Sequence, residues 1–207
     1  MSAREELVAG AAALGIALPQ GATEQLLAHV ALIEKWNRVY NLTAVREPAR
    51  MIAQHLLDSL AVVPHLRPGR LLDVGSGAGL PGLPIAIACP DRPVTLLEVI
   101  GKKATFLRQA VIELGLANVD VVAERVEAWT APAGYDVVIS RAFADIPEFV
   151  NLAGRHVAPG GELAAMKGVH PFEELAQLPA AFRLRNVVTL QVPGLDAQRH
   201  LALFDRA

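Results

Sequence analysis

Leu71-Leu72-Asp73-Val74-Gly75-Ser76-Gly77-Ala78-Gly79-Leu80-Pro81-Gly82 is the stretch that decides the fold. A short apolar run leads to an acidic residue, then to three alternating glycines, and then to a predicted helix over residues 83–88. Glycine adopts positive φ angles without strain and places no Cβ between the backbone and a ligand. The first turn of a helix also offers unpaired N–H groups. The stretch therefore predicts a strand, a ligand-binding loop and a helix.

The sequence on either side of this loop predicts an open, doubly wound α/β sheet. Apolar runs of strand length alternate with helical segments from residue 70 onward, which is typical of a mostly parallel sheet covered on both faces. The predicted strands cover residues 70–74, 94–98, 119–123, 135–140, 162–167 and 184–191. The predicted helices cover residues 83–88, 102–114, 146–157 and 171–177. Two last strands, 187–192 and 200–204, joined through Pro193-Gly194, indicate an antiparallel hairpin at one edge.

Two helical segments precede the predicted sheet. Apolar residues recur at three- and four-residue spacing through residues 23–40, and Pro48 can begin a second helix that Pro64 ends. The turn at Arg67-Pro68-Gly69 marks a boundary. We therefore expect residues 1–66 to form an N-terminal helical cap and residues 67–207 the sheet domain, together one compact unit.

Composition limits the class of protein. The chain has 207 residues, of which 53% are hydrophobic and 19% charged, so we expect one folded unit with a substantial core. Its apolar runs are too short for a membrane span and no secretory signal is visible, which predicts a cytoplasmic protein. The single cysteine, Cys89, excludes an internal disulfide, and no residues show metal-ligand spacing. The net charge of −2 means that any nucleic acid would need a local basic patch.

Two acids indicate which ligand the glycine loop would hold. Open α/β sheets bind ligands beyond the carboxyl ends of their strands, where Asp73 and Glu98 are predicted. A carboxylate at the position of Glu98 can accept hydrogen bonds from both hydroxyls of a ribose. Acids disfavour the pyrophosphate of a nicotinamide or flavin cofactor, but they favour S-adenosylmethionine, which carries an ammonium and a sulfonium. We therefore expect S-adenosylmethionine, with a nicotinamide or flavin cofactor and a purely structural turn as the alternatives.

Further segments resemble one family, the bacterial small-subunit rRNA guanine-N7 methyltransferases of the glucose-inhibited division protein B group. The glycine loop alone indicates only a methyltransferase, but the segments together are far more specific and extend over nearly the whole chain. The matching segments are Trp36-Asn37, Tyr40-Asn41-Leu42-Thr43, His55 with Leu57-Asp58-Ser59, Asp73–Pro84, Gly101-Lys102-Lys103, Phe106-Leu107-Arg108, Arg125-Val126-Glu127, Ser140-Arg141-Ala142-Phe143-Ala144, Lys167-Gly168 and Arg199-His200-Leu201.

The resemblance implies the seven-stranded Rossmann-like sheet of methyltransferases. It also implies methyl transfer from S-adenosylmethionine to N7 of a guanine in the 530 loop of 16S rRNA, at position 527 of the standard rRNA numbering. The implied partner is 16S rRNA or the small ribosomal subunit, and we expect a monomer. Since guanine N7 has a free lone pair and no proton to lose, no general base is required, and catalysis can be mainly positioning.

The expected site has a cofactor side and an RNA side. The cofactor side is predicted to consist of Asp73, Gly75, Gly77, Gly79, Leu80, Glu98, Val126, Glu127 and Arg141. Of these, Gly75, Leu80, Val126, Glu127 and Arg141 follow from the resemblance. Lys167 and Arg199 look like the family's RNA-facing or catalytic residues, with Arg141 at the border between the two sides and His200 expected to face RNA.

Other interpretations stay open at this stage. The chain could methylate a small molecule or a protein, or it could be a non-catalytic nucleotide-binding module on the same fold. Asp73 could only cap backbone N–H groups, and His55 and Asp58, three apart on a helix, could either join the cap to the sheet or contact substrate. The basic residues of the last strands are expected to cluster and could meet phosphates; they are Arg183, Arg185, Arg199 and His200.

Overall fold

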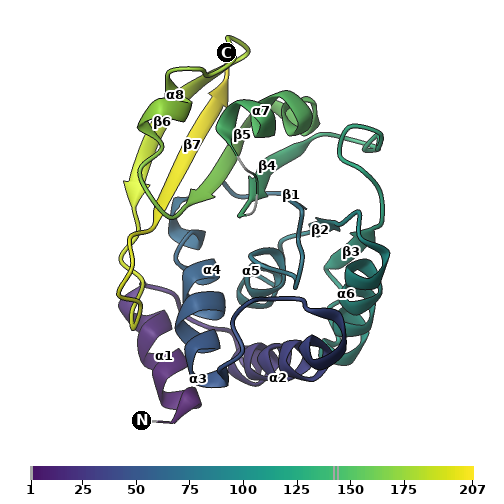
Figure 1. The fold of residues 1–207 in the computed structure, drawn as a ribbon, viewed down its shortest axis with the longest axis vertical. Coiled ribbons are helices and arrows are strands. Elements are labelled where there is room, and N and C mark those ends of the chain that lie inside the picture. The colour runs from purple at the N-terminus through teal and green to yellow at the C-terminus, as the bar shows by residue number, and fades with distance from the viewer. Residues whose placement is uncertain (1, 142, 144) are drawn as a thin grey trace.

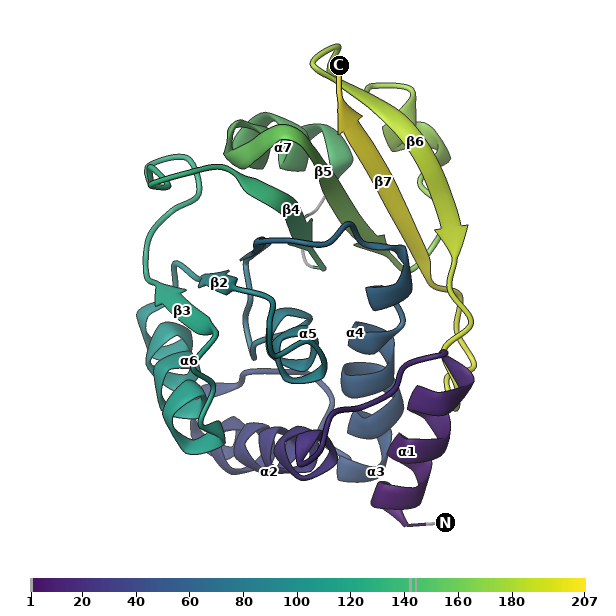
Figure 2. The same cartoon turned by 180° about the vertical axis from the view of Figure 1, so that it is seen from behind.

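Seven strands form a single sheet at the centre of the molecule, and helices cover both of its faces (Figures 1 and 2). The computed structural model describes residues 2–141, 143 and 145–207. The strands are β1 (Leu71–Val74), β2 (Val94–Leu97), β3 (Val119–Val122), β4 (Tyr135–Ser140), β5 (Val157–Lys167), β6 (Phe182–Thr189) and β7 (His200–Arg206). The spatial order β3-β2-β1-β4-β5-β7-β6 reverses on either side of β1, as in doubly wound folds.

The first five strands are parallel, and β7 pairs antiparallel with both β5 and β6. This arrangement confirms the predicted fold class, including the antiparallel hairpin at the C-terminal edge. Because β1, β2 and β4 run in the same direction, their carboxyl ends meet at one edge of the sheet, where the glycine loop begins.

Helices before and between the strands build the two outer layers. They are α1 (Ala3–Ala13), α2 (Ala22–Tyr40), α3 (Pro48–Met51), α4 (Asp58–Leu60), α5 (Gly82–Ala88), α6 (Gly101–Leu114), α7 (Ile146–Ala153) and α8 (Phe172–Leu175). A π-helical segment, Ile52–Leu57, joins α3 to α4. In the described part of the chain, none of these helices has the length and apolar character that crossing a membrane requires.

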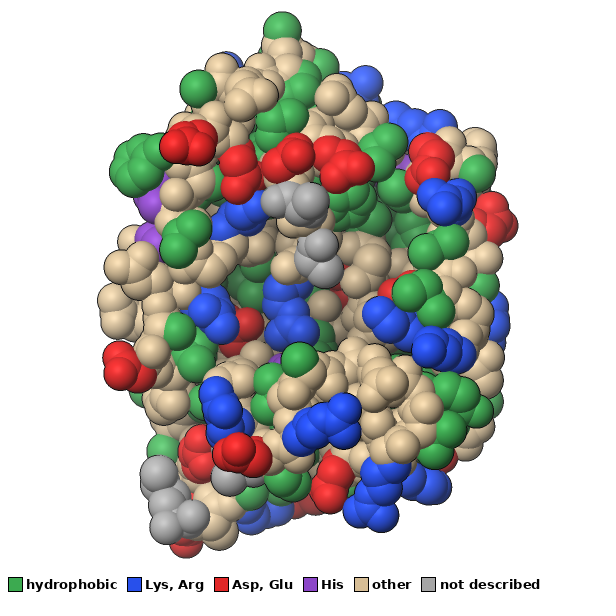
Figure 3. All heavy atoms as spheres, viewed as in Figure 1, with side chains coloured by type: hydrophobic (Ala, Val, Ile, Leu, Met, Phe, Trp, Pro, Cys, Tyr) green, Lys and Arg blue, Asp and Glu red, His purple; other side chains and the backbone are tan. Residues whose placement is uncertain are grey.

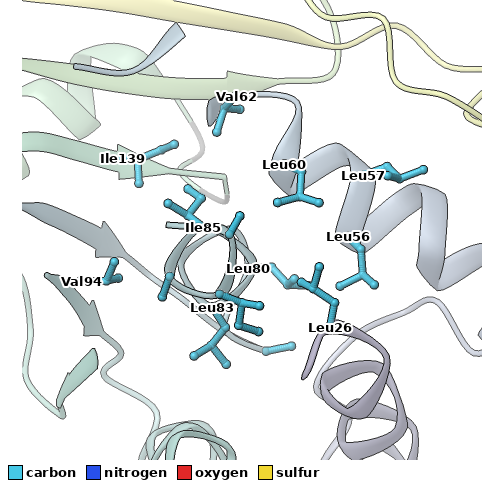
Figure 4. Close-up of a cluster of buried hydrophobic side chains, with 14 of the residues drawn as sticks. Leu26, Leu56, Leu57, Leu60, Val62, Leu80, Leu83, Ile85, Val94 and Ile139 are labelled. Carbon is cyan, nitrogen blue, oxygen red and sulfur yellow. The ribbon is translucent and has the colours of Figure 1, made fainter. Parts of the chain in front are cut away.

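One hydrophobic core joins the N-terminal helices to the sheet. Leu26, Leu56 and Leu60 from the N-terminal helices pack in the same buried cluster as Leu83 and Ile85 of α5 (Figure 4). A second cluster lies on the other face of the sheet, against α7. Residues of one strand alternate between the two clusters: Leu71 faces the first and Leu72 the second. The helical cap and the sheet therefore share a core, which holds the cap rigidly beside the carboxyl edge of the strands.

The structure corrects several predicted boundaries. The helix predicted over 146–157 ends at Ala153, and β5 begins at Val157, so Pro159-Gly160-Gly161 lies inside a bulged strand. The second predicted helix of the cap, 49–63, contains a π-helical turn and ends at Leu60. The sequence analysis did not predict α1, whose Ser2 and Glu5 form a capping box.

Candidate functional site

The loop after β1 has the backbone that its glycines predict. Gly75, Gly77 and Gly79 adopt φ angles of +74°, +58° and +81°. A Cβ added at Gly75 would meet no atom within 4 Å, so this glycine borders open space. A Cβ added at Gly79 would instead collide with the side chain of Leu83. Gly75 thus leaves room for a ligand, whereas Gly79 allows the loop to pack on α5.

Asp73 lies at the end of β1 and is completely buried. Its Oδ2 accepts a hydrogen bond of 3.0 Å from the N–H of Gly82, so the residue closes the turn, as the structural alternative proposed. Its buried Oδ1 has no partner among the described residues. Burial raises the pKa of Asp73 to about 7, although the Gly82 N–H opposes this rise. Because the side chain has no exposed surface and does not line the cavity beside Gly75, the contact of Asp73 with a cationic ligand stays a prediction.

Glu98 holds the glycine loop to the next helix. Its Oε2 accepts a hydrogen bond from the N–H of Gly77, and its Oε1 accepts one from the N–H of Ile100, each at 2.8 Å. Sequence reasoning did not anticipate this bridge. Each carboxylate oxygen can still accept one more hydrogen bond, so the ribose role of Glu98 stays a prediction.

A cavity of about 280 Å³ lies beside Gly75. It extends from the ends of β1 and β2 to the segment after β3, where Val126 and Glu127 were predicted to touch the cofactor. Its lining residues are Val74, Gly75, Leu97, Val99, Glu124, Arg125, Val126, Glu127, Phe143, Glu148 and Leu152. The structure therefore brings three of the predicted cofactor residues together around one cavity.

Leu80 does not line this cavity. Its side chain is buried in the core beside Leu26 and Leu83 (Figure 4). Only the backbone of Leu80 is therefore available for the predicted contact with a cofactor, because the glycine loop packs against the cap and the side chain of Leu80 points into the core.

The segment that carries Val126 is held in place by two residues that the sequence analysis missed. The carbonyl oxygen of Val126 accepts a hydrogen bond from Nη2 of Arg155 at 2.9 Å and lies 3.1 Å from Nε2 of His156. Arg155 also donates to the carbonyl of Trp129. Arg155 and His156 follow α7, far from Val126 in sequence, so only the fold brings them together.

A second cavity, of about 350 Å³, lies where the cap meets the ends of β4, β5 and β7. Its wall contains all the residues predicted to face RNA, because the register of the sheet pairs Lys167 with His200. The lining residues are Val45, Gln54, His55, Asp58, Arg141, Met166, Lys167, Gly168, Leu190, Arg199 and His200. The space-filling view shows a central hollow on this face, with Lys and Arg side chains on its walls (Figure 3).

Ion pairs order the cationic side chains of this second cavity. Oδ1 of Asp58 lies 3.0 Å from Nε of Arg199, and its Oδ2 lies 3.6 Å from Nη1 of Arg141. Nζ of Lys167 lies 2.8 Å from Oε1 of Glu174, an acid that the sequence analysis did not single out. The same carboxylate accepts the N–H of Ile146 at 2.7 Å, so it also anchors the start of α7.

His55 also lines the second cavity, and it is neutral at pH 7. Burial, together with the nearby charge of Arg141, lowers the pKa of His55 to about 4. Its Nε2 lies 3.0 Å from the hydroxyl of Thr43, which connects the helix to the loop after α2.

The structure also places the basic residues of the last strands and the ring of Trp36. The predicted basic cluster of the last strands is wrong: Arg183 pairs in register with Asp205, at the opposite end of the hairpin from His200. Arg185 makes ion pairs there with Glu162 and Asp205. The ring of Trp36 is partly buried against the core and packs edge-on against Phe106, with 5.6 Å between centroids. Two alanines of the Ser140–Ala144 motif, Ala142 and Ala144, lie outside the described residues.

Arg141 lines the second cavity and acts electrostatically on the glycine loop. It directly follows β4, pairs with Asp58 in the second cavity, and its charge acts on Asp73 at the glycine loop. Burial lowers the pKa of Arg141, while the charges of Asp58 and Asp73 raise it. Within residues 2–141, 143 and 145–207, no group of three or more His, Cys, Asp or Glu residues could hold a metal ion.

Solved structures share the fold. The glycopeptide N-methyltransferase MtfA, solved with S-adenosylmethionine, superposes with a TM-score of 0.60 at 12% identity, over 75% of this chain and 88% of that one. The N-methyltransferase NodS from Bradyrhizobium japonicum WM9, solved with S-adenosylhomocysteine, gives a TM-score of 0.58 at 14% identity, over 84% and 98% of the two chains. At such identities the likeness concerns the fold.

Sequence relatives are much closer. The ribosomal RNA small subunit methyltransferase G of Laribacter hongkongensis is 57% identical over 201 residues, which covers 97% of each chain. The protein of the same name from Nitrosospira multiformis is 53% identical over 214 residues, with 100% of this chain and 99% of that one covered. Residues 22–202 match the family GidB, described as rRNA small subunit methyltransferase G. The chain therefore belongs to the GidB family, whose members are S-adenosylmethionine-dependent rRNA methyltransferases.

Proposed function

We propose that this enzyme transfers a methyl group from S-adenosylmethionine to N7 of a guanine in the 530 loop of 16S rRNA. The observation that carries the proposal is the pair of cavities at the carboxyl edge of the sheet, one at the glycine loop and one with a cationic wall. The proposed place of action is the cytoplasm, and the proposed active form is a monomer.

The first cavity fits the methyl donor. Gly75, Val126 and Glu127 would hold S-adenosylmethionine, with Asp73 offering its unpaired oxygen to a cationic group. When bound there, the donor supplies an electrophilic methyl group on a sulfonium. The chain contributes a rigid loop, since Glu98 and Gly82 tie its two ends to neighbouring elements.

The second cavity fits a nucleotide of RNA. Its cationic residues, Arg141, Lys167 and Arg199, come from three different strand ends and offer N–H donors to acceptor oxygens of a guanine nucleotide. An A-form helix hides the major-groove edge that carries N7, so the base must enter from a loop or an unstacked position. A cavity open to the surface supports this mode of binding.

The titratable groups of the second cavity support a reaction without a general base. Asp58 is engaged by two arginines, and Glu174, the partner of Lys167, also accepts the N–H of Ile146. His55 is neutral at pH 7 because burial lowers its pKa to about 4. Methylation at N7 suits such a site, because the attacking atom has a lone pair and loses no proton. The residues would then act by orientation of the base.

Mapping of methylated guanines in 16S rRNA tests the proposal. In cells that lack the gene, primer extension after chemical cleavage at N7-methylguanine should lose the stop in the 530 loop, and the purified enzyme should restore it. Methylation at another rRNA position would contradict the proposed target. Methylation of small molecules or proteins, with no response to rRNA, would contradict the proposed substrate class.

A further inference from the structure

Asp58 is a buried carboxylate at the wall of the second cavity, at the start of α4. Only 2% of the residue is exposed. Its two oxygens meet two guanidinium groups, Arg199 at 3.0 Å and Arg141 at 3.6 Å. Arg141 follows β4, whereas Arg199 precedes β7, so one acid of the helical cap joins side chains from two separate strands.

The charges of this trio do not cancel. One carboxylate faces two guanidinium groups, which leaves one net positive charge in a partly enclosed space. Burial raises the pKa of Asp58, but the charges of Arg141 and Arg199 oppose this rise. His55 contributes no charge at pH 7, and Lys167 has its own partner in Glu174. The trio therefore offers a cationic surface whose two arginines are already oriented.

Without the carboxylate, the two arginines would lose their common acceptor and repel each other. Long arginine side chains would then sample many rotamers, and binding would have to order them again. A shared acid avoids this loss of conformational entropy on binding, since the guanidinium groups keep one geometry before RNA binds. Glu98 and Asp73 hold the backbone of the glycine loop, so a change at Asp58 leaves the hydrogen bonds of that loop in place.

We propose that Asp58 is a positioning residue that holds Arg141 and Arg199 ready for acceptor oxygens of the target nucleotide. This inference rests on the proposed function for its ligand, an RNA nucleotide. Asp58 itself touches the arginines rather than the reacting atoms, so its effect on RNA binding passes through them.

The chain contains a matched control for this role. Glu162 is fully buried and faces two arginines, Arg67 and Arg185, as Asp58 faces Arg141 and Arg199. It lies in the middle of β5, in register with Asp205 near the C-terminal end of β7, and it lines neither cavity. A loss of folding stability alone should affect Glu162→Gln and Asp58→Asn alike.

The experiment measures binding of a short RNA stem-loop that carries the target guanine, by fluorescence anisotropy, in parallel with binding of S-adenosylmethionine by calorimetry. We expect Asp58→Asn to weaken RNA binding by about tenfold or more, because it unpairs two half-buried guanidinium groups, while affinity for S-adenosylmethionine changes by less than about twofold. Asp58→Glu keeps the charge and should retain most of the affinity. If Asp58→Asn binds RNA as well as Glu162→Gln does, the proposal is wrong.

A double-mutant cycle with Arg199 separates positioning from an independent role. If Asp58 acts through the arginines, Asp58→Asn should lower RNA affinity less in the Arg199→Ala chain than it does in the wild-type chain. Equal losses in both backgrounds would overturn the proposal. Should Asp58→Asn fail to fold, the same cycle run with Asp58→Ser gives the same comparison, because serine also removes the charge.

The salt dependence of RNA binding identifies the oxygen involved. A lost phosphate contact reduces the slope of log affinity against log salt concentration by about one unit in Arg199→Ala, whereas a lost contact with a base oxygen leaves it unchanged. Either slope, together with a weaker affinity of Arg199→Ala for RNA, supports a role for Arg199 in binding an RNA oxygen. An unchanged affinity with an unchanged slope would contradict that role. The binding assay also remains informative if methylation maps to another rRNA position, so the proposed target can fail without this inference.

Discussion

Two carboxylates at the carboxyl edge of the sheet, Asp73 and Glu98, have structural roles in addition to their predicted ligand contacts. Asp73 closes the glycine turn and still has an unpaired oxygen, and Glu98 joins that loop to α6. Their position could be predicted, because each ends a strand beside the glycines. Their backbone partners could not, because these depend on how the loop turns.

Replacement of Glu98 tests its two roles. Glu98→Ala should weaken binding of S-adenosylmethionine by roughly 1–3 kcal/mol, measured by calorimetry, since it removes acceptors for two backbone N–H groups and for a ribose. The exposed Asp120→Ala is the control. An analogue of S-adenosylmethionine without ribose hydroxyls separates the two roles. If Glu98 binds ribose, the difference in affinity between the analogue and S-adenosylmethionine should be smaller in Glu98→Ala than in the wild-type chain. Unchanged affinity for the natural donor would remove Glu98 from the site.

Asp73 predicts a pH dependence of cofactor binding. Because burial raises its pKa to about 7, the carboxyl is largely protonated in the free enzyme below that pH. A cationic ligand favours the ionised form, so binding should release a proton, and affinity should increase as pH rises from about 5.5 to 7. Calorimetry in two buffers of different ionisation enthalpy measures the proton. Asp73→Asn should abolish both effects, and a wild-type affinity that is independent of pH would contradict this role.

At the scale of elements, the glycine loop and the sheet could be read from the sequence. The strand, loop and helix over residues 71–88 are local, so their pattern predicts them. The misses have non-local causes. The first half of β5 pairs with β4 across a bulge despite its proline and glycines, and α1 buries only Leu7, Gly10 and Ala11, a weak periodic signal. The supports of Val126 by Arg155 and His156 exist only in the folded chain.

Two glycines of one loop should respond differently to the same substitution. Gly79→Ala should lower the free energy of unfolding by about 2–4 kcal/mol, since it adds a collision with Leu83 to a strained positive φ. Gly75→Ala should lower it by only about 1–2 kcal/mol, because its Cβ enters open space. It should nevertheless weaken binding of S-adenosylmethionine, because that space is the cavity.

Chemical denaturation and calorimetry measure both effects. Gly160→Ala is the control, with a φ of +78° and open space far from the glycine loop. It should match Gly75→Ala in stability but keep wild-type affinity for the donor. Equal donor affinity in Gly75→Ala and Gly160→Ala would show that the cavity beside Gly75 is not the donor site.

At the scale of the whole molecule, the cap and the sheet together form the second cavity, which is the proposed substrate side. The sheet supplies Arg141, Lys167 and Arg199, and the cap supplies His55 and Asp58. The helical spacing in the sequence placed His55 and Asp58 on one face, but only the packing of the cap on the sheet shows that they meet arginines from two strands. The match to GidB over residues 22–202 extends across both parts.

Arg199 should separate binding of the donor from methylation. Arg199→Ala should lose most methylation of 16S rRNA, because the substitution removes a guanidinium group from the second cavity. Affinity for S-adenosylmethionine should stay within about twofold of the wild-type value. Methyl incorporation and calorimetry on the same preparation measure both quantities. The exposed Arg183→Ala, at the far end of the hairpin, should resemble the wild-type enzyme in both. A parallel loss of donor binding in Arg199→Ala would place Arg199 on the cofactor side.

A crystal structure with S-adenosylhomocysteine tests the central claim most directly, that the donor binds at the glycine loop and the RNA base beside it. Density for the ligand should lie against Gly75 and reach Val126, with a cationic group near Oδ1 of Asp73, and the cavity around Asp58 should stay open. Density between Lys167 and Arg199, or remote from both cavities, would contradict the assignment of the two sites.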